Sequence, residues 1–124
     1  MIRPTTAPTS VDIEEAVLES WPLEDSQIQA GNPEASGVLL WRSDDEKTAV
    51  GVWQCTPGAF DWTHVDETFV IVRGRATIEA EGGQRIELAP GVVAFFPNGT
   101  KTRWTVHETI RKGFHLHSHT PIQF

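Results

Sequence analysis

The sequence is poor in cysteine, tyrosine and positive charge. Cys55 is the only cysteine, so neither an intramolecular disulfide nor a cysteine-rich zinc site can form. No apolar run approaches the roughly 20 residues of a membrane-spanning helix, and the opening residues MIRPTTAPTS lack the apolar core of a signal peptide. Against 17 Asp and Glu residues there are only 10 Lys and Arg residues, a formal net charge of −7. We therefore expect a cytoplasmic protein that binds neither nucleic acid nor membranes.

What the chain does contain suits one globular domain. Its 124 residues match a common domain size, and 39% of them are hydrophobic. Aromatic residues are unusual in kind, with five Trp and six Phe. So much ring surface in a short chain is expected to be buried or to line a cavity.

The first third of the chain differs in pattern from the rest. Residues 1–35 are predicted to form an N-terminal arm, with a short helix starting at Ser10 and packing on the remainder. Residues 36–124 show strand patterns separated by turn residues every eight to twelve positions, which is typical of an antiparallel barrel. The predicted strands are residues 38–42, 48–55, 68–72, 76–80, 85–88, 92–96, 102–108 and 110–117. The fold class is therefore all-β, a single antiparallel β-barrel.

Alternation along the strands predicts which side chains enter the barrel. If Glu67 points inward, Phe69 and Ile71 do so too. If Thr102 points inward, Trp104 and Val106 likewise point inward. The expected interior is an aromatic pocket around one carboxylate, the usual form of a small-molecule site. Residues 68–72 are nearly all β-branched or aromatic, so we expect this strand to be covered on both faces, by the arm or by a partner subunit.

Two glycine-rich spacings resemble the motifs of the cupin superfamily. Gly58 is followed after five residues by His64, and Glu67 after six by Gly74. Gly91, Pro97 and Gly99 match the second motif, but Thr102 stands at its histidine position. Asp66 similarly replaces the second histidine of the first motif. The segment WQCTPGAFDW, the shortened histidine loop, Trp104 and the Arg111-Lys112 pair resemble one group of small cupins, largely of unknown function, related to ureidoglycine aminohydrolase and to ethanolamine-utilisation cupin domains.

The resemblance implies a jelly-roll barrel and a set of candidate site residues. Cupin metals are usually held by three histidines and one glutamate, and here only His64 and Glu67 remain, so we expect no full metal site although a divalent metal stays possible. The same two residues are the catalytic candidates, Glu67 as general base or acceptor and His64 as its proton partner. The substrate-binding candidates are the inward aromatic residues and one hydroxyl: Trp53, Trp62, Phe69, Phe96, Thr102 and Trp104.

Three further features carry weaker expectations. Cys55 is expected to be a small buried hydrophobic residue with an unreactive thiol. His115, His117 and His119 share one strand face and would supply missing metal ligands if that face looked inward, but a polar outer face is the favoured interpretation. Arg111 and Lys112 are expected to form exposed ion pairs.

Three functions remain open from the sequence. The preferred one is a cupin that binds, and as an enzyme would transform, a small nitrogen-containing or carbonyl metabolite around Glu67. The alternatives are a metal-dependent dioxygenase or isomerase, and a non-catalytic homodimeric binding or sensing module. The sequence names no substrate.

Overall fold

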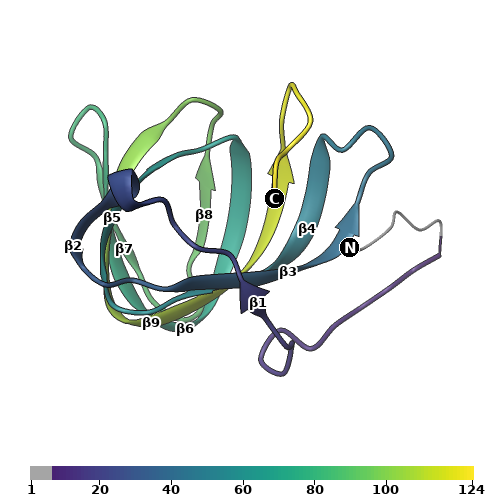
Figure 1. The fold of residues 1–124 in the computed structure, drawn as a ribbon, viewed down its shortest axis with the longest axis horizontal. Coiled ribbons are helices and arrows are strands. Elements are labelled where there is room, and N and C mark those ends of the chain that lie inside the picture. The colour runs from purple at the N-terminus through teal and green to yellow at the C-terminus, as the bar shows by residue number, and fades with distance from the viewer. Residues whose placement is uncertain (1–6) are drawn as a thin grey trace.

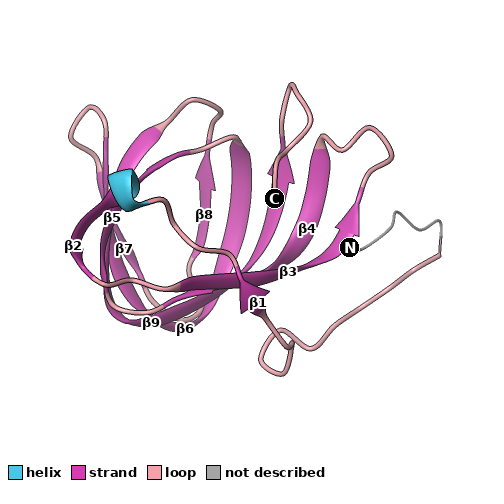
Figure 2. Cartoon of the chain, viewed as in Figure 1, coloured by secondary structure: helices cyan, strands magenta, loops and turns pink. Residues whose placement is uncertain are grey.

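A computed structural model describes residues 7–124. Within these residues, strands and connecting loops make up the structure apart from one short 3-10 helix, η1 (Asp25–Gln27), as Figure 2 shows. In chain order the strands are β1 (Glu19–Ser20), β2 (Ile28–Gly31), β3 (Ala35–Arg42), β4 (Thr48–Cys55), β5 (Gly58–Thr63), β6 (Asp66–Ala80), β7 (Arg85–Leu88), β8 (Val93–Phe96) and β9 (Lys101–His117). The predicted all-β fold class is confirmed.

All nine strands belong to one antiparallel sheet that curls around an interior (Figure 1). The long strand β9 is its centre: its first half pairs with β5, its second half pairs with β4, and β6 lies along its other edge. β7 and β8 continue the sheet beyond β6. Because β9 is paired on both edges along most of its length, it brings the inward side chains of β4, β5 and β6 into one interior.

The two longest strands were each predicted as two. Residues 68–72 and 76–80 form one strand, β6, in which the pairing with β9 shifts between Ile71 and Ala76. Because side chains alternate, this irregularity changes the inward set from odd to even positions, so that Phe69 and Ile78 both face the interior. Gly74 lies at the irregularity with a φ of 88°, and a Cβ there would clash with the Thr109 carbonyl oxygen. The glycine is thus required for close strand packing rather than for a turn.

The predicted helix from Ser10 is wrong. The chain makes one hydrogen-bonded turn there, in which the Ala16 amide donates to the Asp12 carbonyl oxygen at 2.9 Å. Arg111 then attaches the segment to the sheet by donating to the carbonyl oxygens of Ile13 and Ala16. Tertiary hydrogen bonds and packing outweigh the weak helix preference of so short a segment.

The faces of the barrel follow the predicted alternation. Glu67, Phe69 and Ile71 are 4%, 2% and 1% exposed, and Thr102, Trp104 and Val106 are equally buried. The outer side of residues 68–72 is not covered: Thr68 is exposed, and Val70 is 37% exposed. The expectation that this strand is buried on both faces therefore does not hold within one chain.

Among residues 7–124 there is no helix with the length and apolar character to cross a membrane.

Candidate functional site

The centre of the barrel holds a buried ion pair. Lys112 on β9 is the register partner of Trp53 on β4 and of Ile71 on β6, so its side chain enters the interior. Its Nζ lies 2.7 Å from Oε2 of Glu67, and only 7% of the Lys112 side chain and 5% of the Glu67 side chain are exposed. The sequence prediction of Lys112 as an exposed ion-pair residue is wrong.

Three aromatic rings surround the ammonium group. Nζ of Lys112 lies 4.3 Å from the ring centroid of Phe69, 4.7 Å from that of Trp53 and 4.9 Å from that of Trp104. The negative faces of such rings attract a cation, most strongly where water is excluded. The three rings therefore help Glu67 to hold the charge of Lys112 inside the barrel.

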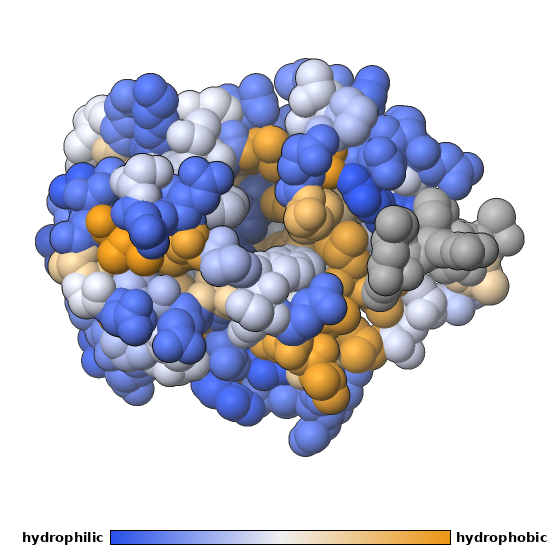
Figure 3. All heavy atoms as spheres, in the orientation of Figure 1, coloured by the Kyte–Doolittle hydropathy of each residue, from blue (hydrophilic) through white to orange (hydrophobic). Residues whose placement is uncertain are grey.

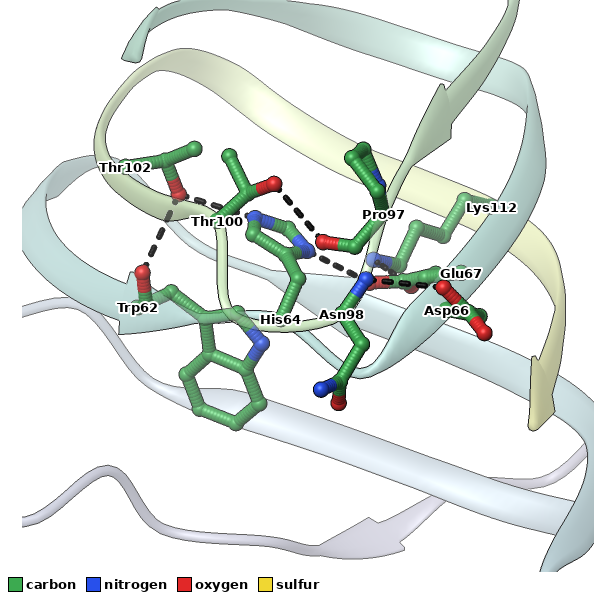
Figure 4. Close-up of polar contacts among 9 residues, drawn as sticks. All are labelled: Trp62, His64, Asp66, Glu67, Pro97, Asn98, Thr100, Thr102 and Lys112. Carbon is green, nitrogen blue, oxygen red and sulfur yellow. Dashed lines mark hydrogen bonds and ion pairs between the residues drawn. The ribbon is translucent and has the colours of Figure 1, made fainter. Parts of the chain in front are cut away.

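His64 extends the polar network on the other side of Glu67. Its Nδ1 lies 3.0 Å from Oε1 of Glu67, and its Nε2 lies 2.8 Å from Oγ1 of Thr102 (Figure 4). An ionised carboxylate can only accept hydrogen bonds, so in the contact with Glu67 the proton is on Nδ1 of His64. The imidazole stacks on Phe96 at a centroid distance of 4.4 Å, which fixes its plane. His64 is thereby oriented at both nitrogens and on one ring face.

The network sets the charge of Glu67. Burial alone would raise the pKa of its carboxyl group, but the charge of Lys112 and hydrogen bonds from His64 and Lys112 lower this pKa to about 2. Glu67 is therefore a carboxylate in any ordinary buffer. Cys55 behaves oppositely: burial raises the pKa of its thiol to about 12, with the charge of Lys112 acting against the rise, so Cys55 is the inert buried residue predicted.

A cavity of about 850 Å³ opens above the ion pair. Figure 3 shows this face of the molecule hollowed, with hydrophobic residues gathered around the hollow. Glu67 and Lys112 belong to the cavity lining, together with the ring-bearing side chains Trp21, Trp53, Phe60, Trp62, Trp104, Phe114 and Phe124. The segment before η1 and residues 118–124 complete its rim. The site is an aromatic pocket with a charged floor.

Not every predicted binding residue reaches this cavity. Trp53, Trp62 and Trp104 line it, whereas Phe69 and Phe96 lie beneath the ion pair and His64 as packing residues. Thr102 contacts His64 and belongs to the lining of a separate, shallower hollow. The positions of Phe69, Phe96 and Thr102 do not test whether these residues contact a ligand.

The remaining metal-ligand candidates lie outside the barrel interior. Asp66 accepts a hydrogen bond from the Asn98 backbone amide at 2.7 Å, as Figure 4 shows. His115, His117 and His119 are exposed, and His117 contacts Thr48 through Nδ1 at 3.0 Å. The favoured interpretation of this histidine run as a polar outer face is confirmed.

The donor set at the centre does not fit a divalent metal. Both nitrogens of His64 are engaged, and the carboxylate of Glu67 is already paired with an ammonium group that would repel a second cation. Within residues 7–124, no three His, Cys, Asp or Glu side chains are grouped so as to hold a metal ion. Lys112 thus engages the carboxylate, and Thr102 the imidazole nitrogen, that a cupin metal would need as ligands.

Comparison with known families agrees with this geometry. The EutQ-like cupin domain family matches residues 42–114, which is more than half of the chain and includes the whole ion-pair network. The chain belongs to this family. No protein with curated functional information matches it.

Solved structures show how widely the cupin fold is shared. EutQ of Clostridium difficile is 19% identical, with a TM-score of 0.68 over 88% of this chain and 86% of that one. A protein of unknown function from the DUF861 family of Pseudomonas syringae pv. tomato is 23% identical, with a TM-score of 0.75 over 83% of this chain. Our cupin spans only 45% of that protein's length. A DUF861 family protein from Thermotoga maritima is 32% identical over 52% of this chain and 75% of its own, with a TM-score of 0.51. These similarities support the cupin fold, and the function has to be argued from the residues of the site.

Lys112 is the residue that sequence reasoning missed, although a signal for it was present. Lys112 alternates in step with Phe114 and Leu116 along its strand, so the three side chains share one face. The histidines predicted to face outward lie on the opposite face. A lysine on the inward side of a strand that faces a buried glutamate indicates a buried pair. Charge alone had suggested the surface.

Proposed function

We propose that this cupin binds a small metabolite in the aromatic cavity above Glu67 and Lys112. The observation that carries the proposal is the position of a buried, fully oriented ion pair on the floor of a cavity of about 850 Å³. Pockets for small molecules are commonly apolar with a few polar groups that fix orientation. The ligand class is a nitrogen-containing or carbonyl metabolite, and the single buried thiol, Cys55, is compatible with work in the cytoplasm.

Glu67 and His64 are the groups that would give such a ligand its chemistry. Glu67 is ionised with a pKa of about 2, well below that of an efficient general base at neutral pH, so it serves as an oriented acceptor with His64 as its proton partner. Lys112 supplies a positive charge without any metal. In this proposal, therefore, catalysis or binding depends on the ion pair and not on a full metal site.

A thermal-shift screen of small nitrogen-containing and carbonyl metabolites tests the proposal. A specific ligand should raise the melting temperature of the wild type. Glu67→Gln, which itself melts lower because it leaves Lys112 unpaired, should show no such rise. Glu108→Gln removes the same charge at an exposed position outside the cavity lining and should leave the rise unchanged. If Glu67→Gln binds as the wild type does, the role of Glu67 is refuted.

We also propose that the cupin works as a homodimer. Val70, Val93 and Phe95 are 37%, 67% and 58% exposed on the outer face. They are neighbours there, because Val70 pairs with Val93 and Thr68 with Phe95. Burial of this apolar surface against a second copy would offset the like-charge repulsion between two chains of net charge −7. A non-catalytic dimeric module shares this feature, and the ligand screen separates the two functions.

A further inference from the structure

The floor of the cavity has more hydrogen-bond donors than acceptors. The ammonium group of Lys112 carries three N–H donors. Within residues 7–124 its hydrogen-bond acceptor is Glu67, through Oε2, and three ring centroids lie 4.3, 4.7 and 4.9 Å from Nζ. Ring faces attract the charge but do not replace an oxygen acceptor. Lys112 therefore retains donor capacity toward the cavity that it lines.

Trp104 adds a second unused donor. Its indole Nε1 is buried and has no hydrogen-bond partner in the part of the chain that the structure describes. Trp104 is 1% exposed, belongs to the cavity lining and lies against Lys112. A buried N–H group without an acceptor is unfavourable and rare in native proteins.

By contrast, both carboxylate oxygens of Glu67 on the cavity floor already have hydrogen-bond partners. Oε1 of Glu67 lies against His64, and Oε2 lies against Lys112. A ligand that complements this site must therefore carry an oxygen acceptor. Such a ligand needs no hydrogen-bond donor of its own.

Charge narrows the class of ligand. Lys112 is already neutralised by Glu67, so a carboxylate ligand would place a second negative charge beside a buried carboxylate. A cationic ligand would instead be placed beside the ammonium group. Either charge would lose its hydration in an apolar cavity without a free counter-charge. A neutral oxygen acceptor avoids both penalties.

We propose that Lys112 takes the place of the cupin metal and that the ligand is a neutral carbonyl compound, whose oxygen accepts a hydrogen bond from the Lys112 ammonium group. This inference rests on the proposed function and names its ligand class: a ketone, aldehyde or amide with an apolar body. The body packs against Trp53, Phe60 and Trp104, which line the same cavity. The ammonium group polarises the carbonyl bond as a bound metal ion would, next to the carboxylate of Glu67.

Four probes with a similar phenyl skeleton test the ligand class. Acetophenone carries the carbonyl oxygen, ethylbenzene carries no polar group, benzoate is an anion and 1-phenylethylamine is a cation. Binding is followed by NMR titration of the wild type and of the double variant Glu67→Gln with Lys112→Met, which removes both charges together and avoids an unpaired buried ion. Ring resonances of Trp53 and Trp104 report on the cavity.

The wild type should bind acetophenone about tenfold or more tightly than each of the other three, the effect of one charge-assisted hydrogen bond. The double variant should bind acetophenone and ethylbenzene alike. Equal binding of ethylbenzene and acetophenone by the wild type would overturn the carbonyl assignment and leave the proposed function standing. Tightest binding of benzoate or of 1-phenylethylamine would likewise refute the neutral class. If no probe perturbs the cavity, this inference and the proposed ligand site fail together, whereas failure of the metabolite screen alone would not affect the probe result.

Discussion

Lys112 and Glu67 lie on the neighbouring strands β9 and β6, and their charged groups meet at 2.7 Å inside a barrel whose other interior side chains are mostly apolar or aromatic. Removing charges from water is costly, and the pair is tolerated because each ion has the other and further partners. For Glu67 the further partner is His64, and for Lys112 it is the ring faces of three residues. Each of these relationships has a measurable consequence.

Breaking the ion pair from one side should destabilise the protein strongly. Lys112→Met leaves the carboxylate of Glu67 buried without its cation, so we expect the free energy of unfolding in urea to fall by about 3–5 kcal/mol. Adding Glu67→Gln removes the uncompensated charge and should restore most of that loss. Equal unfolding free energies for Lys112→Met and the wild type would show that the pair is not formed.

The pH dependence of stability should carry the signature of Glu67. Its pKa is about 2 in the folded protein and about 4.3 in an unfolded chain, so within this window the unfolded state binds more protons. The stabilisation from Glu67 is therefore complete above the unfolded pKa and disappears as the pH falls toward about 2. Between pH 6 and the lowest pH at which both proteins stay folded, the wild type should lose more stability than Glu67→Gln, by up to about 3 kcal/mol. Parallel curves for the two proteins would contradict the lowered pKa.

The hydroxyl of Thr102 should matter to His64. Thr102→Val keeps the shape of the side chain but leaves Nε2 of His64 buried without its partner. We expect a loss of about 1–3 kcal/mol of unfolding free energy. Thr100→Val is the matched control, because its hydroxyl contacts the Pro97 carbonyl oxygen in an exposed turn. A larger loss for Thr100→Val than for Thr102→Val would refute the assignment.

Gly74 should tolerate no side chain. An alanine Cβ there would meet the Thr109 carbonyl oxygen, and its φ of 88° disfavours every other residue. Gly82 has a similar φ of 100°, but a Cβ at Gly82 meets nothing within 4 Å. Gly82→Ala should thus cost about 1 kcal/mol from strain alone, and Gly74→Ala at least about 2 kcal/mol more. Similar losses in urea unfolding would show that the close strand approach is absent.

The proposed dimer depends on Val93 and its neighbours. Val93→Glu places a charge in the apolar patch on the outer face and should convert a dimer to a monomer in size-exclusion chromatography with light scattering. Gln84→Glu adds the same charge in the exposed β6–β7 turn and should leave the dimer intact. A wild type that is monomeric at all concentrations would remove the homodimer proposal.

The fold was largely predictable because turn residues and alternation are local signals. The strands Thr48–Cys55 and Arg85–Leu88 match their predicted bounds, and the inward set around Glu67 and Trp104 is confirmed. The sequence did not show that the predicted strands join into the single long strands β6 and β9. For β6 the reason is that a glycine such as Gly74 fits a turn and a bulge equally well.

The candidate site was only half predictable. Glu67 and His64 were identified through motif spacing, but their contact with each other and with Thr102 depends on three segments far apart in the chain. Lys112 was assigned to the surface because isolated lysines usually lie there, and only the opposing carboxylate makes its burial possible. The rim from residues 118–124 carries no local signal at all.

The most direct test is the NMR chemical shift of the Lys112 ε-methylene protons. The chain has three lysines, and Lys47 and Lys101 are internal references, Lys101 being exposed. Three ring faces around Nζ should move the Lys112 signal well upfield of both references, and Glu67→Gln should change it more than theirs. A Lys112 signal that coincides with that of Lys101 would place the ammonium group in water and contradict the buried ion pair on which the account depends.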